Sequence, residues 1–204
     1  MFERFTKDAR EVVLGAVAHA DRAGAERVEE THVLLALLDR EGSRGSFALA
    51  SLGLPPGGRE GVVRELAEAR RRGGLSRADA DALSGLGIDL TEIVSRIEEA
   101  HGEGVLADGG QGGSPGRRSG RRPFARGARE LLAESLRVTL GHRDRRIGDE
   151  HLLLALTARP GVPAEVLAGH GVTYESLKRV LYGTDTGTDR GVDPGTGSGE
   201  PKAG

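Results

Sequence analysis

Apolar residues near the start of the chain recur at the spacing of one face of an α-helix. The repeating positions are Val12, Val13, Ala16, Val17 and Ala20. They follow the spacing i, i+1, i+4, i+5 and i+8, which places them on one stripe of a helix. Thr6 stands where an N-cap hydroxyl accepts a hydrogen bond from the first free amides. The pattern predicts an amphipathic first helix that begins after Thr6.

The same order of apolar and polar positions returns in the second half of the chain. RVEETHVLLAL at residues 27–37 is repeated as RIGDEHLLLAL at residues 146–156, which aligns His32 with His151. The register extends backward and, after a one-residue deletion, forward. FTKDAREVV (5–13) aligns with FARGARELL (124–132), and LASLGL (49–54) aligns with LAGHGV (167–172). The chain therefore contains a tandem duplication.

Each copy carries the signals of several short helices. The acidic residues around Glu30 and Asp149 suit the start of a second helix. Gly53 and Gly171 follow short helical segments and suit C-terminal caps. The last helix of each copy is expected over residues 59–72 and 174–182. We predict an all-α domain of about eight to ten helices, in which two pseudo-twofold-related copies bury their apolar stripes against each other.

The expected organisation has five parts. They are repeat 1 (1–72), a helical extension (73–104), a flexible linker (105–122), repeat 2 (123–182) and a disordered tail (183–204). In the extension, LSGLGIDLTEIVSRIEEAHG (83–102) resembles the ending of each repeat, with Leu90, Ile93, Val94 and Ile97 on one helix face, and we interpret it as an additional half-unit. The linker and tail are rich in glycine and poor in apolar residues, a composition that cannot bury a core.

Composition excludes several classes of protein. The chain has no cysteine, which rules out disulfides, thiolate zinc sites and a cysteine nucleophile and is compatible with a reducing compartment. Its formal net charge of −2 predicts no general attraction to nucleic acid or anionic lipid. The longest apolar run, Val33–Leu38, is far shorter than the roughly 20 residues of a membrane span, and no signal peptide is recognisable. We expect a cytoplasmic protein that does not enter a membrane.

The motifs that suggest catalysis stand in the wrong context. Gly112–Gly116 has the G-x-S-x-G spacing but lies in the linker rather than at a strand-to-helix turn. GTGSGEPK in the tail lacks the Gly-Lys-Ser/Thr ending of a phosphate loop. The histidines form no i, i+4 pair of metal ligands, so His32 and His151 are interpreted as hydrogen-bonded structural residues at helix starts. We expect no enzyme, no cofactor and no metal.

An arginine-rich stretch leaves one alternative open. RRSGRRPFAR (117–126) is a short basic segment that suits contacts to nucleic acid phosphates. A solvated linker is the favoured interpretation, because electrostatic binding requires a continuous basic surface. Nucleic acid is therefore not an expected partner, and a nucleic-acid-associated or regulatory role remains the alternative function.

Three features of the sequence occur together: the opening MFERFTKDAREVV, the paired Val/Ile-x-x-Thr/Glu-His-Val/Leu-Leu-Leu-Ala-Leu motifs, and the Leu-x-x-x-Gly-Leu/Val endings. Together they resemble the Clp repeat, the duplicated helical module at the N-terminus of the ClpA, ClpC and ClpB chaperone ATPases. The resemblance is greatest to the ClpC type and covers residues 1–72 and 123–182. The phosphate loops of the ATPase modules have no counterpart in this sequence, so we expect a freestanding N-domain.

The resemblance implies a protein-binding function. Such N-domains dock adaptors and substrates for the ATPase ring, and the ClpC type recognises phosphorylated arginine. The implied partners are Clp ATPase or protease components, adaptor or substrate proteins, and cyclic or linear peptides, which this chain would present or sequester. The phosphate of phosphoarginine requires a helix N-terminus, a hydroxyl and a cation, and its guanidinium requires a carboxylate.

The family positions carry over to six residues of this chain. The first copy has Thr6 and Arg10, with Thr31 at the acidic position and Glu30 before it. The second copy has Arg129 and Glu150, with Ala125 at the hydroxyl position. Taken copy by copy, each set lacks one element, and a lost charge-assisted bond costs roughly 1.5–3 kcal/mol. One composite or degraded site is the alternative to two intact sites. The alternative interpretation of Arg10, Arg129 and Glu150 is that of solvated charges at helix ends.

Three phenylalanines occupy positions that, by the same resemblance, lie near the groove where partner segments bind. Phe5 and Phe124 are related by the duplication and are expected to contribute to the core. Phe2 has no counterpart in the second copy and precedes the first cap, so we expect it to be exposed. Phe2 and Phe124 are therefore candidate contacts for a peptide partner.

Overall fold

The computed structural model describes residues 4–72, 75, 77–89, 92, 93, 95, 96, 99 and 122–183. Over these residues the chain forms nine α-helices, one short 3₁₀ helix and no β-strand, which confirms the predicted all-α class. The helices are α1 (Lys7–Arg22), α2 (Glu30–Leu38), α3 (Arg44–Ser51), η2 (Pro56–Gly58), α4 (Glu60–Arg71), α5 (Arg77–Gly85), α7 (Arg126–Gly141), α8 (Asp149–Thr157), α9 (Val162–Gly169) and α10 (Tyr174–Tyr182).

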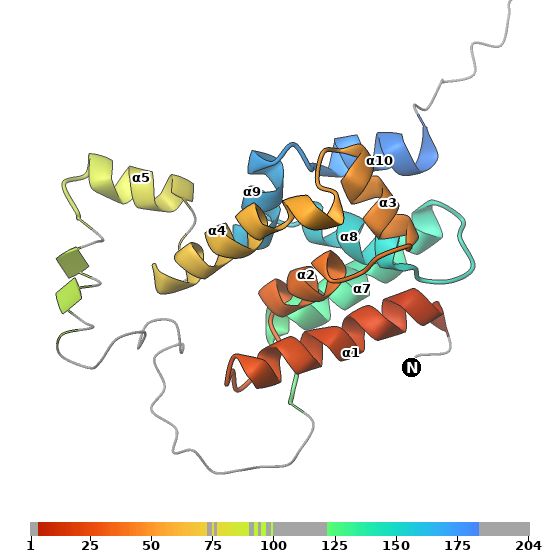
Figure 1. Cartoon of the computed structure of the whole chain (residues 1–204), viewed down its shortest axis with the longest axis horizontal. Helices are drawn as coiled ribbons and strands as arrows, with labels where there is room; N and C mark the ends of the chain where they lie inside the picture. The colour runs from red at the N-terminus through yellow and green to blue at the C-terminus, as the bar shows by residue number, and fades with distance from the viewer. Residues whose placement is uncertain are drawn as a thin grey trace, which may run out of the picture.

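The first helix forms as its sequence pattern predicts. The amide of Ala9 donates a hydrogen bond to the hydroxyl of Thr6 at 3.2 Å, which satisfies one free amide at the start of α1. The buried face of α1 consists of Ala9, Val12, Val13, Ala16 and Ala20. This face packs on α2, and α7 packs on α8 in the same way (Figure 1).

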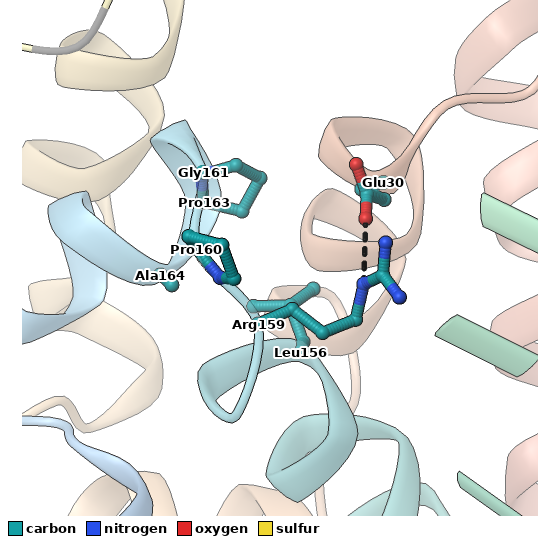
Figure 2. Close-up of a pocket in the computed structure, with 7 residues that line it drawn as sticks. All are labelled: Glu30, Leu156, Arg159, Pro160, Gly161, Pro163 and Ala164. Atoms are coloured by element: carbon teal, nitrogen blue, oxygen red, sulfur yellow. Dashed lines mark hydrogen bonds and ion pairs between the residues drawn. The ribbon is translucent and has the colours of Figure 1, made fainter. Parts of the chain in front are cut away.

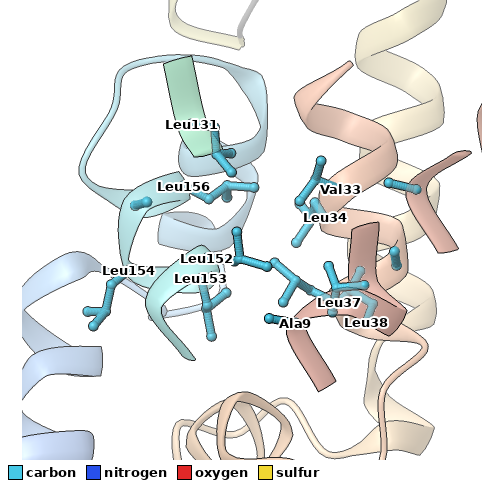
Figure 3. Packing of buried hydrophobic residues seen from close by; sticks show 14 of the residues in the cluster. Ala9, Val33, Leu34, Leu37, Leu38, Leu131, Leu152, Leu153, Leu154 and Leu156 are labelled. Carbon is cyan, nitrogen blue, oxygen red and sulfur yellow. The ribbon is translucent and has the colours of Figure 1, made fainter. Parts of the chain in front are cut away.

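The core lies between α2 and α8, the two short apolar helices. Both are almost completely buried, and Leu152 of α8 points toward Leu34 and Leu37 of α2 (Figure 3). The shorter helices then cross from one copy to the other. α3 packs against α8 and α10, whereas α9 packs against α2 and α4. Each copy therefore covers the apolar side of the other.

The predicted glycine caps are present. Gly53 and Gly171 have φ angles of 92° and 78°, a conformation that glycine adopts without steric cost. The last helices, α4 and α10, begin and end within one residue of the ranges expected from the sequence.

A buried arginine supports the end of α2. Arg59 is 4% exposed, and its guanidinium donates to the carbonyls of Leu38 and Arg40 and to the hydroxyl of Ser46. Burial lowers the pKa of Arg59 from its usual value. The side chain satisfies carbonyls that the helix end leaves free, so this buried cation has a structural role.

Several sequence predictions lie outside the described residues. These are the exposure of Phe2, the flexibility of linker residues 105–121, the disorder of residues 184–204, and the contribution of Leu90, Val94 and Ile97 to the additional half-unit. The five-part domain division remains a prediction. α5 belongs to the expected extension and stands apart from the other helices in Figure 1.

No single helix within the described ranges combines the length and apolar character that crossing a membrane requires. By length and composition only, α8 and α9 together would satisfy that requirement, and the two are bent by 96° at the break between them.

Candidate functional site

The two copies cross at two isolated parallel bridges. One bridge joins Phe5 to Ile147: the amide of Thr6 donates to the carbonyl of Ile147 at 2.9 Å, and the amide of Ile147 donates to the carbonyl of Arg4 at 2.7 Å. The other joins Val28 to Phe124 through hydrogen bonds of 2.8 and 2.9 Å that involve Pro123 and Ala125. The start of α1 therefore lies beside the start of α8, and the start of α7 lies beside the start of α2.

This crossing decides which candidate residues lie near one another. Taken copy by copy, Thr6 and Arg10 would act with Glu30 and Thr31, but the bridges place them at the segment that leads into Glu150 instead. We call this region the α1–α8 site. The α7–α2 site consists of Ala125 and Arg129 from one copy with Glu30 and Thr31 from the other. A composite site was one of the alternatives that the sequence left open, and the bridges indicate which residues would form it. The repeat pattern alone defines helix faces, not the partner across the copies.

At the α1–α8 site the hydroxyl and the cation already have local partners. The Thr6 side chain caps α1. The exposed Arg10 donates from Nε and Nη2 to the carbonyl of Phe5, at 3.3 and 3.1 Å. A ligand at this site would compete with both local interactions.

The carboxylates of the α1–α8 site are buried, and each forms hydrogen bonds or an ion pair within the chain. Asp149, 2% exposed, accepts hydrogen bonds from the Ser43 hydroxyl and, at 3.0 Å, from the Gly45 amide at the start of α3. Glu150, 7% exposed, forms an ion pair with Arg44 at 3.2 Å. The interpretation of Glu150 as a solvated helix-end charge is therefore wrong, whereas Arg10 and Arg129 are exposed.

The α7–α2 site has a different arrangement. Ala125 is the N-cap of α7 and has no side-chain acceptor for the first amides. The side chain of Arg129 is exposed and forms no hydrogen bond or ion pair with the described residues. The carboxylate of Glu30 lies directly against Gly127 in the first turn of α7, where a Cβ atom would approach Glu30 Oε2 to 2.5 Å. Glycine at this position lets a carboxylate of one copy reach the helix start of the other.

Arg159 holds Glu30 in place. Its Nε atom lies 3.3 Å from Glu30 Oε1 (Figure 2), and its Nη2 atom lies 2.8 Å from Glu130 Oε2. A shallow pocket adjoins this ion pair, and its apolar lining comes from Leu156, Pro160, Pro163 and Ala164 (Figure 2). The site thus combines carboxylates, an exposed arginine and a small apolar surface.

The phenylalanines of the bridges are structural. Phe5 is 7% exposed and belongs to the core, and Phe124 is half-buried against it. Their backbones form the two bridges. The burial of Phe5 confirms its expected core role, whereas the half-buried Phe124 stays a candidate contact for a peptide. Thr31 is half-buried and Phe2 lies outside the described residues.

The paired histidines close the starts of α2 and α8. His32 Nδ1 accepts a hydrogen bond from the Glu29 amide, and His151 Nδ1 accepts one from the Gly148 amide, both at 2.9 Å. This confirms their structural interpretation. In the described part of the chain, no three His, Cys, Asp or Glu residues are placed to hold a metal ion.

Residues around Glu150 were missed by the sequence analysis. Arg44 also donates to the Leu181 carbonyl at 3.1 Å and lies over the Tyr182 ring, 5.1 Å from its centroid. Tyr182 donates to Asp144 at 3.1 Å. These residues lie outside the motifs that the copies share, so the duplication gave no signal for them.

The described part of the arginine-rich stretch is engaged within the chain. Arg122 bonds to Asp21 and to the carbonyl of Ala25, and Arg126 forms an ion pair with Glu130 at 2.7 Å. Arg122 is therefore engaged with α1 and the segment after it, whereas Arg126 remains exposed beside a carboxylate that reduces the local positive charge. Arg117, Arg118 and Arg121 lie outside the described residues.

Two buried groups make the stability of the fold depend on pH in opposite directions. Burial raises the pKa of Glu150 to about 7, and burial next to Arg70 lowers the pKa of His32 to about 4. The fold favours protonated Glu150, so this group makes stability fall as pH rises from about 4.5 to about 7. The fold favours neutral His32, so stability from this group rises between about pH 4 and pH 6.5.

Replacing Glu150 by glutamine should remove the loss of stability that its titration causes as pH rises. Relative to wild type, Glu150→Gln is expected to gain a few kcal/mol of unfolding free energy between about pH 4.5 and pH 7, since one pKa unit corresponds to about 1.4 kcal/mol. Urea denaturation at several pH values measures this difference, in which groups common to both proteins cancel. Parallel stability curves for the two proteins would show that Glu150 does not titrate in this range.

Comparison with known proteins supports the fold. No family model matches the chain. A structure from preliminary structural investigations of a malarial protein secretion system is similar with a TM-score of 0.53 at 14% identity, over 87% of this chain and 92% of that one. At this identity the similarity concerns the fold alone.

Two further solved structures cover most of the chain. The N-terminal domain of the caseinolytic protease associated chaperone ClpD from Arabidopsis thaliana has a TM-score of 0.47 and 17% identity, over 89% of this chain and 94% of that one. The Hsp104 N-terminal domain from Candida albicans has a TM-score of 0.46 and 15% identity, over 88% and 89%. Because both scores lie below 0.5, the conclusion about the fold does not depend on them.

Proposed function

We propose that this protein is a non-catalytic protein-binding module of the Clp chaperone–protease system that acts in the cytoplasm. Its proposed partners are substrate or adaptor proteins, or peptides, that carry a charged group recognised at the α7–α2 site. The Clp-repeat motifs of both copies support this function. The observation that carries it is the carboxylate of Glu30 against Gly127 in the first turn of α7, a helix start that has no side-chain cap and that also carries the exposed Arg129.

Phosphoarginine fits the chemistry of the α7–α2 site. Its phosphate would bind Arg129 and the first amides of α7, because a helix N-terminus and an arginine both favour a phosphate group. Its guanidinium would bind the carboxylate of Glu30, which matches the fork of guanidinium donors. The absence of a hydroxyl at Ala125 removes one contact but leaves both charged contacts in place.

The α1–α8 site is the weaker candidate. It keeps the hydroxyl of Thr6 and the cation of Arg10, but both side chains bond within the chain. The carboxylate of Glu150 is buried and paired with Arg44, whereas the side chain of Glu30 is 31% exposed and paired with Arg159. A guanidinium ligand would have to displace an arginine at either site, and Glu30 is the more accessible carboxylate. We therefore propose that the α7–α2 site is the principal site.

A titration with free phosphoarginine, followed by backbone amide shifts, tests this function. Shifts are expected around Arg129 and Glu30. Because each variant loses one charge-assisted contact, Glu30→Gln and Arg129→Gln should each weaken binding about tenfold or more. Matched controls are Glu165→Gln, an exposed glutamate on α9, and Arg10→Gln at the other site, which should leave these shifts unchanged.

Three results would contradict the proposal. Absence of amide shifts with phosphoarginine and also with arginine-phosphorylated peptides would remove the proposed ligand. Shifts centred on Arg10 and abolished by Arg10→Gln would place the principal site at α1–α8. Nucleotide hydrolysis by the purified chain would contradict the non-catalytic function.

A further inference from the structure

Arg40 and Arg159 occupy equivalent positions in the two copies, shortly after α2 and α8. The register of the duplication aligns Arg40 with Arg159 and Glu11 with Glu130. Arg40 forms an ion pair with Glu11 of α1, and Arg159 forms the equivalent ion pair with Glu130 of α7. The two arginines therefore share the same kind of partner within their own copy.

The second partner of each arginine comes from a different copy. Arg40 also pairs with Asp8 of its own α1, at 2.7 Å. The residue equivalent to Asp8 in α7 is Gly127, which has no carboxylate. The carboxylate of Glu30 from the other copy lies against Gly127 instead, 3.3 Å from Nε of Arg159 (Figure 2). Arg159 thus holds one carboxylate of each copy, whereas Arg40 holds two of its own.

The two bonds of Arg159 are unequal. Its Nη2 donates to Glu130 at 2.8 Å, whereas its Nε donates to Glu30 at 3.3 Å. The hydrogen bond with Glu130 is also the largest cause of the raised pKa of Arg159. Because the bonds use different nitrogens, the guanidinium can release Glu30 and keep Glu130. The side chains of Arg159 and Glu30 are 27% and 31% exposed, so a solute reaches this contact from the surface.

We propose that Arg159 is an internal competitor for the guanidinium of the ligand at Glu30, an inference that rests on the proposed function of the α7–α2 site. In the free chain the Arg159 guanidinium occupies this carboxylate. A ligand guanidinium replaces it, and Arg159 remains on Glu130. The bond that Arg159 loses reduces the free energy that the ligand gains, so Arg159 lowers the affinity of the site.

This role is opposite to that of Arg129. Loss of Arg129 removes a cation that would bind the phosphate of the ligand, so it should weaken binding. Loss of Arg159 frees the carboxylate that would bind the guanidinium, so it should strengthen binding. The two arginines near one site are therefore distinguished by the sign of their effect on affinity.

Isothermal titration calorimetry of the full chain with free phosphoarginine tests the proposal. Arg159→Met keeps the aliphatic stem and removes the guanidinium. Arg126→Met is the charge-matched control, because Arg126 also pairs with Glu130, at 2.7 Å, and its loss leaves the contact of Arg159 with Glu30 in place. Arg159→Met should bind about tenfold more tightly than Arg126→Met, since only the first variant frees Glu30.

The Nε proton resonance of Arg159 gives a second measurement. This proton is donated to Glu30 in the free chain. Phosphoarginine should move the resonance of the wild-type chain toward its position in Glu30→Gln, because both changes take the Glu30 carboxylate away from Arg159. Circular dichroism of the methionine variants should match wild type, since both ion pairs lie at the surface.

The outcomes separate this inference from the proposed function. If wild type binds but Arg159→Met binds no more tightly than Arg126→Met, the internal competitor is overturned and the proposed function stands. An Nε resonance of Arg159 that stays unmoved in the ligand-bound chain has the same consequence. Binding by Arg159→Met alone would support the competitor and contradict the proposed function of the wild-type chain. Absence of binding in wild type and both variants would overturn both.

Discussion

Replacement of Leu152 by alanine is expected to lower the free energy of unfolding by about 3–5 kcal/mol. Leu152 is completely buried in α8 and lies at the contact with α2, where the two copies meet (Figure 3). Truncation removes the apolar side chain from the core and leaves a cavity that the surrounding helices fill only in part. Urea denaturation followed by circular dichroism measures the loss.

Leu140→Ala provides the control for this prediction. Leu140 is 59% exposed on α7, so the same truncation there should change stability by less than about 0.5 kcal/mol. Equal effects of the two substitutions would show that Leu152 is not in the interface between the copies.

Replacement of Asp149 by alanine is expected to lower stability by about 2–4 kcal/mol. The Asp149 carboxylate belongs to the second copy but accepts hydrogen bonds from Ser43 and Gly45 of the first. Its removal leaves the buried Gly45 amide without this acceptor and takes a negative charge from the start of α3. A Cβ at Gly45 would approach Asp149 Oδ2 to 2.6 Å, so glycine is needed for this contact.

Thermal or urea unfolding of three variants, Asp149→Ala, Asp149→Asn and Glu165→Ala, separates the loss of the hydrogen-bond acceptor from the loss of the negative charge. The asparagine keeps an acceptor in place and should lose less than the alanine, while the exposed Glu165 should tolerate alanine. An Asp149→Ala protein as stable as wild type would show that the carboxylate does not join the copies.

The helices of this fold were predictable because their signals are local. The stripe from Val12 to Ala20, the cap at Thr6 and the glycines at positions 53 and 171 each depend on spacing or on backbone conformation at one position. Leu83-Ser-Gly-Leu-Gly-Ile was also recognisable as a third ending, because it repeats the same spacing.

The composition of the site was not predictable in the same way. Repeats show which positions are equivalent, but they do not show whether Thr6 lies beside Glu30 or beside the segment before Glu150. The bridges from Phe5 to Ile147 and from Val28 to Phe124 decide this question, and they join residues far apart in the sequence. Arg44 likewise pairs with Glu150 across the copies, without a repeated motif to indicate it.

A double-mutant cycle on phosphoarginine binding tests most directly whether a site is assembled from both copies. The account predicts that Arg129→Gln and Glu30→Gln, which lie in different copies, are coupled by about 0.5–3 kcal/mol, because they bind one ligand. It predicts no coupling between Arg10→Gln and Glu30→Gln, which lie in the same copy. Coupling of Arg10 with Glu30, together with independence of Arg129 from Glu30, would contradict the account.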